Sequence, residues 1–231
     1  MNRKVTVLIF LFLSFFPLIA HSSLADEGST IAIVGAMEKE IEPFLLRMNV
    51  TRSYTYEDLT LWEGILNGKD VILVECGVGQ ESASFLVNNY RIEALIFSGV
   101  GGSTELGIDV GDVVVASDFL SINPFEIYSS DARLASLAMN NSFDFDVHYG
   151  RFYTTTPLII DEFILYPYLR LRDVSCVEME NFPMARVAAE KGIPFLSVRG
   201  ISDQIPLGPS HALTVQAPQR SCSRACSSCC Y

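Results

Sequence analysis

Short apolar runs alternate with segments of helical periodicity along most of the chain. Continuous runs of β-branched and other apolar residues are typical of strands that are buried on both faces. The segments between them place apolar residues three and four positions apart, which is the pattern of a helix packed on one side. This pattern predicts strands at 30–35, 94–98, 112–116, 176–179 and 194–198, and helices at 38–48, 80–90 and 182–191, the last closed by Gly192.

Two local features refine this pattern. Asn67-Gly68 separates two strand-like segments, 54–66 and 70–75, and this dipeptide strongly favours a tight hairpin because both residues tolerate a positive φ. Pro43 interrupts the first helical segment, so that helix either begins late, with Pro43 in its first turn, or kinks there.

The alternation of strands and helices predicts an α/β fold with a mixed, mainly parallel twisted sheet flanked by helices on both faces. The hairpin supplies the antiparallel part of this sheet. Residues 119–150 are more polar and aromatic, and we expect a loop-rich excursion there. No linker divides the chain, so we expect one domain at 26–207.

The N-terminal segment has the features of a secretory signal peptide. Arg3 and Lys4 precede an uncharged apolar run at 5–20, and Ser23 and Ala25 are small residues at the positions that a signal peptidase reads. A membrane anchor is the alternative, but a spanning helix needs about 20 apolar residues. We therefore expect cleavage after residue 25, a secreted or periplasmic protein, and membrane contact only through an uncleaved segment.

Charge and cysteine content narrow the function further. The 231 residues contain 16 Lys and Arg against 27 Asp and Glu, a formal charge of −11, without a basic cluster. Nucleic-acid binding needs concentrated positive charge, so we expect no nucleic-acid partner.

Cys76 and Cys176 lie in apolar runs and are expected to be buried small side chains. Four further cysteines crowd the segment 208–231, which has no apolar period, and we expect an atypical, poorly packed tail there.

Candidate functional residues follow the apolar runs, because ligands of such sheets bind at the carboxyl ends of the strands. Glycines and carboxylates dominate these positions. After removal of the signal peptide only His148 and His211 remain, which is a poor supply for a multi-histidine metal site. The segments concerned are 35–40, 76–79, 98–102, 177–180 and 202–203.

The carboxylates carry most of the chemical information. Glu178 and Glu180 are two residues apart at the end of a predicted strand, so they should share one face. Buried acids are costly unless they bind hydroxyls, pair with cations or transfer protons. The alternative is that both lie beyond the sheet edge in water. Asp203 either faces the same site or caps a following helix.

In this order and at these intervals, the segments resemble the 5′-methylthioadenosine/S-adenosylhomocysteine nucleosidases of the nucleoside phosphorylase superfamily. The resemblance covers residues 30 to about 205 and is loosest over 119–170. It implies hydrolysis of the N-glycosidic bond between adenine and a 5′-thio-substituted ribose, without metal or cofactor, by a homodimer. The matching segments are GAMEKE (35–40), CGVG (76–79), SGVGG (98–102), VGDVVV (110–115), VEME (177–180) and VRGISD (198–203).

By this resemblance, Glu40 would activate the attacking water and Asp203 would protonate the purine. Such a reaction develops oxocarbenium character on the sugar and negative charge on the base, so acids at both places are chemically reasonable. Substrate binding would fall to Glu180 with Met179 at the ribose, Val78 in the sugar pocket, the backbone of Leu158 and Ile159 at adenine, and the neighbouring Glu178 and Ser202.

The chain departs from the family pattern at four places, and two other functions stay open. Val100 stands where the family usually has Ser, and Leu158 stands where an adenine-stacking Phe is common. The family's usual His-Asp-containing segment after Val115 is lacking, and the Cys-rich tail replaces the last helix. A phosphorylase would use phosphate as nucleophile, with Lys39 and Arg47 as the nearest cations. A non-catalytic nucleoside-binding or storage protein is the other alternative. The segment 119–128 is the candidate apolar contact surface for a dimer.

Overall fold

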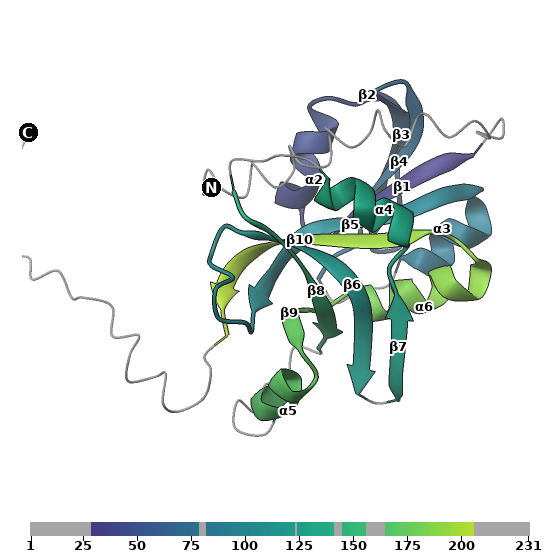
Figure 1. Ribbon diagram of the computed structural model, residues 1–231. Coiled ribbons are helices and arrows are strands. Elements are labelled where there is room, and N and C mark those ends of the chain that lie inside the picture. The colour runs from purple at the N-terminus through teal and green to yellow at the C-terminus, as the bar shows by residue number, and fades with distance from the viewer. Residues whose placement is uncertain (1–28, 79–81, 123, 141–144, 156–164, 206–231) are drawn as a thin grey trace, which may run out of the picture.

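The computed structural model describes residues 29–78, 82–122, 124–140, 145–155 and 165–205 (Figure 1). The expected signal peptide, the expected tail, and Leu158 and Ile159 lie outside these residues. Within them, a ten-stranded mixed sheet is flanked by helices, which confirms the expected single α/β domain. Among the described helices, none is long and apolar enough to cross a membrane.

The centre of the sheet is parallel. β1 pairs with β4 and β5, and β5 pairs with β10, all in parallel. Hairpins and returning strands add several antiparallel pairings outside this centre, so parallel pairing is less dominant than expected. The central strands are β1 (Thr30–Gly35), β4 (Lys69–Glu75), β5 (Ile92–Ser103) and β10 (Phe195–Gln204). The outer strands are β2 (Asn49–Tyr56), β3 (Leu59–Leu66), β6 (Val113–Ile122), β7 (Phe125–Ser129), β8 (Val147–Thr154) and β9 (Val174–Glu178).

Strand β5 links the two halves of the sheet. It lies between β1 and β10, and its last residues, Gly102 and Ser103, also pair with β9. Pairing then continues from β10 through β6 and β8 back to β9, so this half of the sheet closes on itself. The glycine-rich end of β5 is therefore surrounded by other strands.

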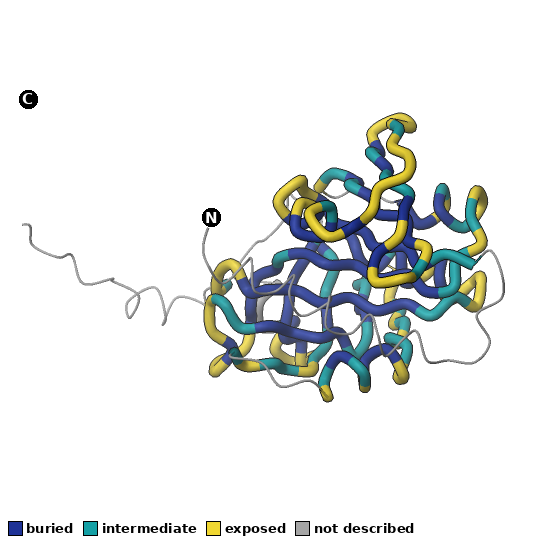
Figure 2. The backbone as a smooth tube through the Cα atoms, turned by 90° about the horizontal axis from the view of Figure 1, so that it is seen from above, coloured by how far each residue is buried: buried dark blue, intermediate teal, exposed yellow. Residues whose placement is uncertain are grey.

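Helices cover both faces of the sheet (Figure 1). Ile31 and Ile33 of β1 pack in one cluster with α2 and α4, whereas Ala32 and Val34 pack in the opposite cluster with α3 and α6. This alternation follows from the period of two along a strand. The strands of the interior are buried, whereas exposure is concentrated at turns and on outer strands such as β2 (Figure 2). The helices are α2 (Glu38–Leu45), α3 (Ala83–Asn89), α4 (Ala132–Met139), α5 (Leu165–Leu171) and α6 (Asn181–Lys191).

The hairpin at Asn67-Gly68 is confirmed, with φ of 50° and 78° at the two residues. The single strand expected at 54–66 is wrong, because it contains a second turn at Glu57-Asp58. Glu57 adopts a φ of 50° there, and Glu57-Asp58 is not one of the glycine-containing dipeptides that usually mark a two-residue hairpin. β2 precedes this turn and is almost entirely exposed.

The loop-rich excursion expected at 119–150 is also wrong. β6 continues to Ile122, and β7, α4 and β8 follow it. β7 pairs with β6 and is exposed at every second residue, which explains its polar and aromatic composition. Asp131 caps α4 by accepting a hydrogen bond from the Leu134 N–H at 2.9 Å.

The helix α2 begins at Glu38, so Pro43 lies in its interior and not in its first turn. Pro43 cannot donate a backbone hydrogen bond, and the helix ends two residues later, before the expected Met48. The early start keeps Glu40 in the first helical turn, directly after β1. The expected end of α6 is confirmed, since Gly192 adopts a left-handed φ of 67°.

Candidate active site

The carboxyl ends of β1, β4, β5, β9 and β10 surround a cavity of about 260 Å³. Every predicted site residue among the described ones lies on its wall, and their chemical roles stay predictions. Leu158 and Ile159 lie outside the described residues. The predicted residues on the wall are Glu40, Val78, Glu178, Met179, Glu180, Ser202 and Asp203, and Met37, Val100, Gly101, Gly102 and Arg199 are among their neighbours.

Glu40 lies in the first turn of α2 and is 3 % exposed. Its Oε2 accepts hydrogen bonds from the backbone N–H of Ala36 at 2.7 Å and of Met37 at 3.1 Å. Its Oε1 accepts from the backbone N–H of Val100 at 2.9 Å. The carboxylate therefore joins the β1–α2 turn to the glycine-rich part of β5 and has a fixed orientation in the cavity.

Burial raises the pKa of Glu40 above its usual range, against the opposing effects of Arg199 and the three backbone N–H donors. A general base is most effective when its pKa approaches the working pH. The environment of Glu40 therefore suits a carboxylate that takes up a proton during the reaction.

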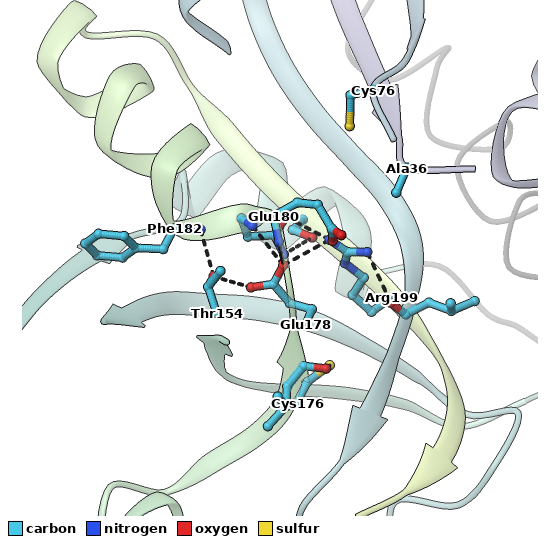
Figure 3. Close-up of polar contacts among 12 residues, drawn as sticks. Ala36, Cys76, Thr154, Cys176, Glu178, Glu180, Phe182 and Arg199 are labelled. Atoms are coloured by element: carbon cyan, nitrogen blue, oxygen red, sulfur yellow. Dashed lines mark hydrogen bonds and ion pairs between the residues drawn. The ribbon is translucent and has the colours of Figure 1, made fainter. Parts of the chain in front are cut away.

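Glu178 and Glu180 converge on the buried side chain of Arg199 (Figure 3). Arg199 Nη2 donates to Glu180 Oε2 at 2.9 Å, to Glu178 Oε2 at 3.1 Å and to Asn181 Oδ1 at 3.1 Å. The guanidinium carbon lies 4.1 Å from the centroid of the Phe97 ring, a cation–π contact. Arg199 is 1 % exposed, so its charge is balanced almost entirely by these carboxylates.

The alternation expected for Glu178 and Glu180 does not explain this convergence. The strand β9 ends at Glu178, and Glu180 is the N-cap residue of α6. The turn between the two elements, not a continuing strand, brings both side chains to Arg199. The alternative that both acids lie in water is wrong, since each is 4 % exposed.

The Glu178 carboxylate holds the start of α6. Its Oε2 accepts from the backbone N–H of Glu180 at 2.7 Å and of Asn181 at 2.8 Å, and its Oε1 accepts from the Thr154 hydroxyl. Thr154 Oγ1 in turn accepts from the Phe182 N–H at 2.8 Å. Protein donors thus occupy both oxygens of Glu178. Because one of these donors is the Glu180 N–H, Glu178 is suited to positioning Glu180 beside the cavity.

Asp203 and Ser202 lie at the exposed end of β10. Ile201 is opposite Gly101 and Asp203 is opposite Gly102, so Ser202 is the extra residue of a β-bulge. A bulge lets consecutive side chains point to the same side, and here the Ser202 hydroxyl donates to Asp203 Oδ1 at 2.5 Å. The structure does not test the capping alternative for Asp203, because residues from 206 onward lie outside the described ones.

Sequence analysis missed Arg199 as a site residue. It lies within the apolar segment that forms β10. A single charge in a buried strand needs buried partners, so this position in the sequence already indicates a polar site around Arg199. The cations considered for phosphate binding, Lys39 and Arg47, are both exposed, and neither is among the residues that line the cavity.

The two described cysteines lie close to the site but are not among the residues that line the cavity. Cys76 and Cys176 are buried, as expected, and burial raises the pKa of the Cys76 thiol to about 12. Such a thiol is a poor nucleophile at neutral pH. Among the described residues, no group of three His, Cys, Asp or Glu side chains could hold a metal ion.

The chain resembles known proteins in both sequence and fold. Residues 30–230 match the family described as the phosphorylase superfamily. The 5′-methylthioadenosine/S-adenosylhomocysteine nucleosidase of Exiguobacterium sp. is 30 % identical over 198 residues, covering 75 % of this chain and 84 % of the relative.

Two solved structures show the same fold. The 5′-methylthioadenosine/S-adenosylhomocysteine nucleosidase from Colwellia psychrerythraea in complex with adenine has a TM-score of 0.68 at 20 % identity, covering 77 % of this chain and 84 % of that chain. A futalosine hydrolase mutant of Helicobacter pylori has a TM-score of 0.67 at 20 % identity, covering 75 % and 89 %.

Proposed function

Because the chain belongs to the 5′-methylthioadenosine/S-adenosylhomocysteine nucleosidase family of the phosphorylase superfamily, we propose that it hydrolyses the N-glycosidic bond of 5′-thio-substituted adenine nucleosides and releases adenine. The observation that carries this proposal is the placement of acids at both ends of one glycine-rich strand segment. Glu40 Oε1 lies beside Gly99, and Asp203 Oδ2 lies beside Gly102.

Two residues, Val100 and Gly101, separate these glycines, so their Cα atoms are about 10 Å apart in the extended strand. A reaction in which water attacks one face of the sugar and the base leaves from the other needs its general base and its general acid apart from each other in one cavity, and Glu40 and Asp203 both line this one. Glu180 and Met179 lie on the cavity wall and would hold the ribose between the general base Glu40 and the general acid Asp203.

The proposed step is a hydrolysis. The water oxygen forms a bond to the anomeric carbon while the bond from that carbon to the purine nitrogen breaks, and the bonding electrons go to the purine. Glu40 accepts a proton from the water, and protonated Asp203 gives a proton to the leaving purine. The products are adenine and the free 5′-thio-sugar.

Arg199 would help Glu40 to bind the attacking water. A Cβ built on Gly99 would lie 2.5 Å from Arg199 Nη1 and 2.9 Å from Glu40 Oε1, so the two groups face each other across this glycine. Both residues are among the described ones, and no direct ion pair joins them. One water making two hydrogen bonds would span such a gap, which is about 5.5 Å at most.

Incubation of the full-length protein with methylthioadenosine in phosphate-free buffer tests the proposal, with adenine release as the readout. Parallel reactions with S-adenosylhomocysteine and futalosine define the 5′ substituent. Turnover that requires phosphate and yields a sugar 1-phosphate would identify a phosphorylase instead. Binding of methylthioadenosine without turnover would identify a non-catalytic nucleoside-binding protein.

The assembly and location of the protein are further parts of this proposal. The segment expected as a dimer surface is divided, since Phe119 is buried whereas Phe125 and Ile127 are about half exposed on β7. We propose a homodimer that uses this strand, and light scattering at micromolar concentration tests it. Export is tested by N-terminal sequencing of protein recovered from the medium or the periplasm, where a new terminus at Asp26 is expected.

A further inference from the structure

Asn181, the first residue of α6, bridges two residues of β10 through its side-chain amide. Its Nδ2 donates to Ser197 Oγ at 2.8 Å, and its Oδ1 accepts from Arg199 Nη2 at 3.1 Å. Asn181 and Ser197 are both 0 % exposed. Ser197 and Arg199 are two residues apart on one strand and therefore share a face, which allows one amide to reach both.

The orientation of this amide follows from its partners. A guanidinium only donates hydrogen bonds, so the amide oxygen must face Arg199 and the amide nitrogen must face Ser197. The Asn181 backbone N–H donates to Glu178 Oε2 at 2.8 Å, which fixes the main chain of the same residue. Asn181 is thus held on both sides and presents a neutral acceptor to Arg199.

This neutral acceptor matters because the other two acceptors of Arg199 Nη2 are charged carboxylates, which attract the guanidinium more strongly. Its Nη2 has two hydrogens but three acceptors, two of which are the carboxylates of Glu178 and Glu180. Its Nη1 donates to the Val100 carbonyl at 3.1 Å and faces Glu40 across Gly99. Without Asn181, the guanidinium would be free to turn toward the two carboxylates and to move Nη1 away from Glu40.

We infer that Asn181, anchored by Ser197, is a positioning residue that holds Arg199 Nη1 toward Glu40, so that both groups can bind the same attacking water. This inference rests on the proposed hydrolysis for its kinetic consequences. The orientation of Arg199 that it describes is independent of the substrate.

The charged and titratable groups around Glu40 define the expected pH effect. Arg199 approaches it from β10 beside Gly99, the Cys76 thiol after β4 interacts with it electrostatically, and Glu178 and Glu180 are ion-paired with Arg199. Arg199 is the cation among them and lowers the pKa of Glu40. Displacement of the guanidinium therefore raises this pKa.

Kinetics of Asn181→Ala with methylthioadenosine test the inference. We expect kcat to fall about 10- to 100-fold, the usual scale for a misplaced catalytic group, while KM stays within about threefold. The acidic limb of the kcat/KM profile should move to higher pH by about half a unit or more. Asn89→Ala is the matched control, because Asn89 is exposed on α3 and bonds only a backbone carbonyl of its own helix. It should behave as wild type.

Ser197→Ala provides an independent variant and covers the case in which Asn181→Ala does not fold. It should change kcat and the acidic limb in the same direction but less, and the double variant should be no worse than Asn181→Ala by more than about twofold. An unchanged acidic limb in the single variants, or effects that multiply in the double variant, would overturn the inference.

Nitrogen-15 NMR of the guanidinium provides a test that does not depend on activity. The hydrogen bonds of the wild type should give Nη signals at distinct shifts, assigned by their loss in Arg199→Lys, and these shifts should change in Asn181→Ala or Ser197→Ala. Signals that are the same in wild type and variants would overturn the inference even for an active enzyme. Absence of adenine release by the wild type would instead refute the proposed function, with the NMR comparison still deciding the role of Asn181.

Discussion

Glu40 and Arg199 both approach the position that a Cβ atom on Gly99 would occupy. Neither group touches the other directly, yet each would lie within 3 Å of a single added carbon at this position. Arg199 is held in place on its other side by Asn181, Glu178 and Glu180. The spacing between the two groups therefore depends on the absence of a side chain at one residue of β5.

The first prediction concerns this spacing. Gly99→Ala should lower kcat for methylthioadenosine by about 100-fold or more, because the new Cβ pushes apart the two groups that bind the water. Gly64→Ala is the control, since its Cβ would lie 2.2 Å from the Asn49 carbonyl oxygen, in the β2–β3 pairing. Gly64→Ala should lower the melting temperature yet keep kcat at 20 °C. Equal loss of kcat in both variants would mean that Gly99 matters only for stability.

The second prediction concerns Asp203 as general acid. Asp203→Asn keeps the size of the side chain but cannot deliver a proton, so adenine release should fall by about 10²–10⁴-fold. A riboside with nitrophenolate as leaving group needs no protonation and should be affected far less. Asp58→Asn, at the exposed β2–β3 turn, is the control and should change neither rate. Equal losses with both substrates would show that Asp203 positions the sugar.

The third prediction concerns Glu40 as general base. Glu40→Gln should slow hydrolysis of both the adenine and the nitrophenyl riboside by about 10²–10⁴-fold, because water must lose a proton whichever group leaves. Glu38→Gln changes an exposed acid in the same helical turn and should keep full activity. Retention of nitrophenyl riboside hydrolysis by Glu40→Gln would contradict this assignment.

The fourth prediction concerns stability and pH. The pKa of Glu40 is raised in the folded state above its usual value of 4.5, so folding favours the protonated form. The contribution of Glu40 is therefore greatest below pH 4.5 and is lost as pH rises through the folded pKa. The unfolding free energy of the wild type minus that of Glu40→Gln should fall from pH 4 to pH 8, by no more than about 1.4 kcal/mol per pH unit. Urea titrations at each pH measure it, and a difference that rises with pH would refute the raised pKa.

The position of the site could be predicted because it depends on topology. Alternating strands and helices place the carboxyl ends of several strands together, and Glu40, Glu180 and Asp203 each follow or end such a strand. No long-range contact had to be known for this prediction. Arg199 lies inside β10 and not at its end, so the topological argument does not reach it, although a charge inside a buried strand is itself an indication of partners.

The missed parts of the fold have different causes. The β2–β3 turn uses Glu57 at a positive φ, and β2 carries no buried face that would show a period of two. β7 is an edge strand whose exposed residues resemble a loop in composition. The bulge at Ser202 changes the alternation by one residue, and its position depends on pairing with β5, which is distant in sequence.

The pairing of β5 with β10 also constrains how the protein can be made. The two strands pair from Leu95–Phe195 to Ser103–Gln204 with one bulge at Ser202, so partners are about one hundred residues apart in the chain. During synthesis, β5 is complete long before β10 leaves the ribosome, and it presents an open, apolar edge for that time. Arg199, Ser202 and Asp203 arrive together on the strand that closes this edge. Pairing of β10 with β5 therefore covers this apolar edge and brings Asp203 to the site in the same late step of folding.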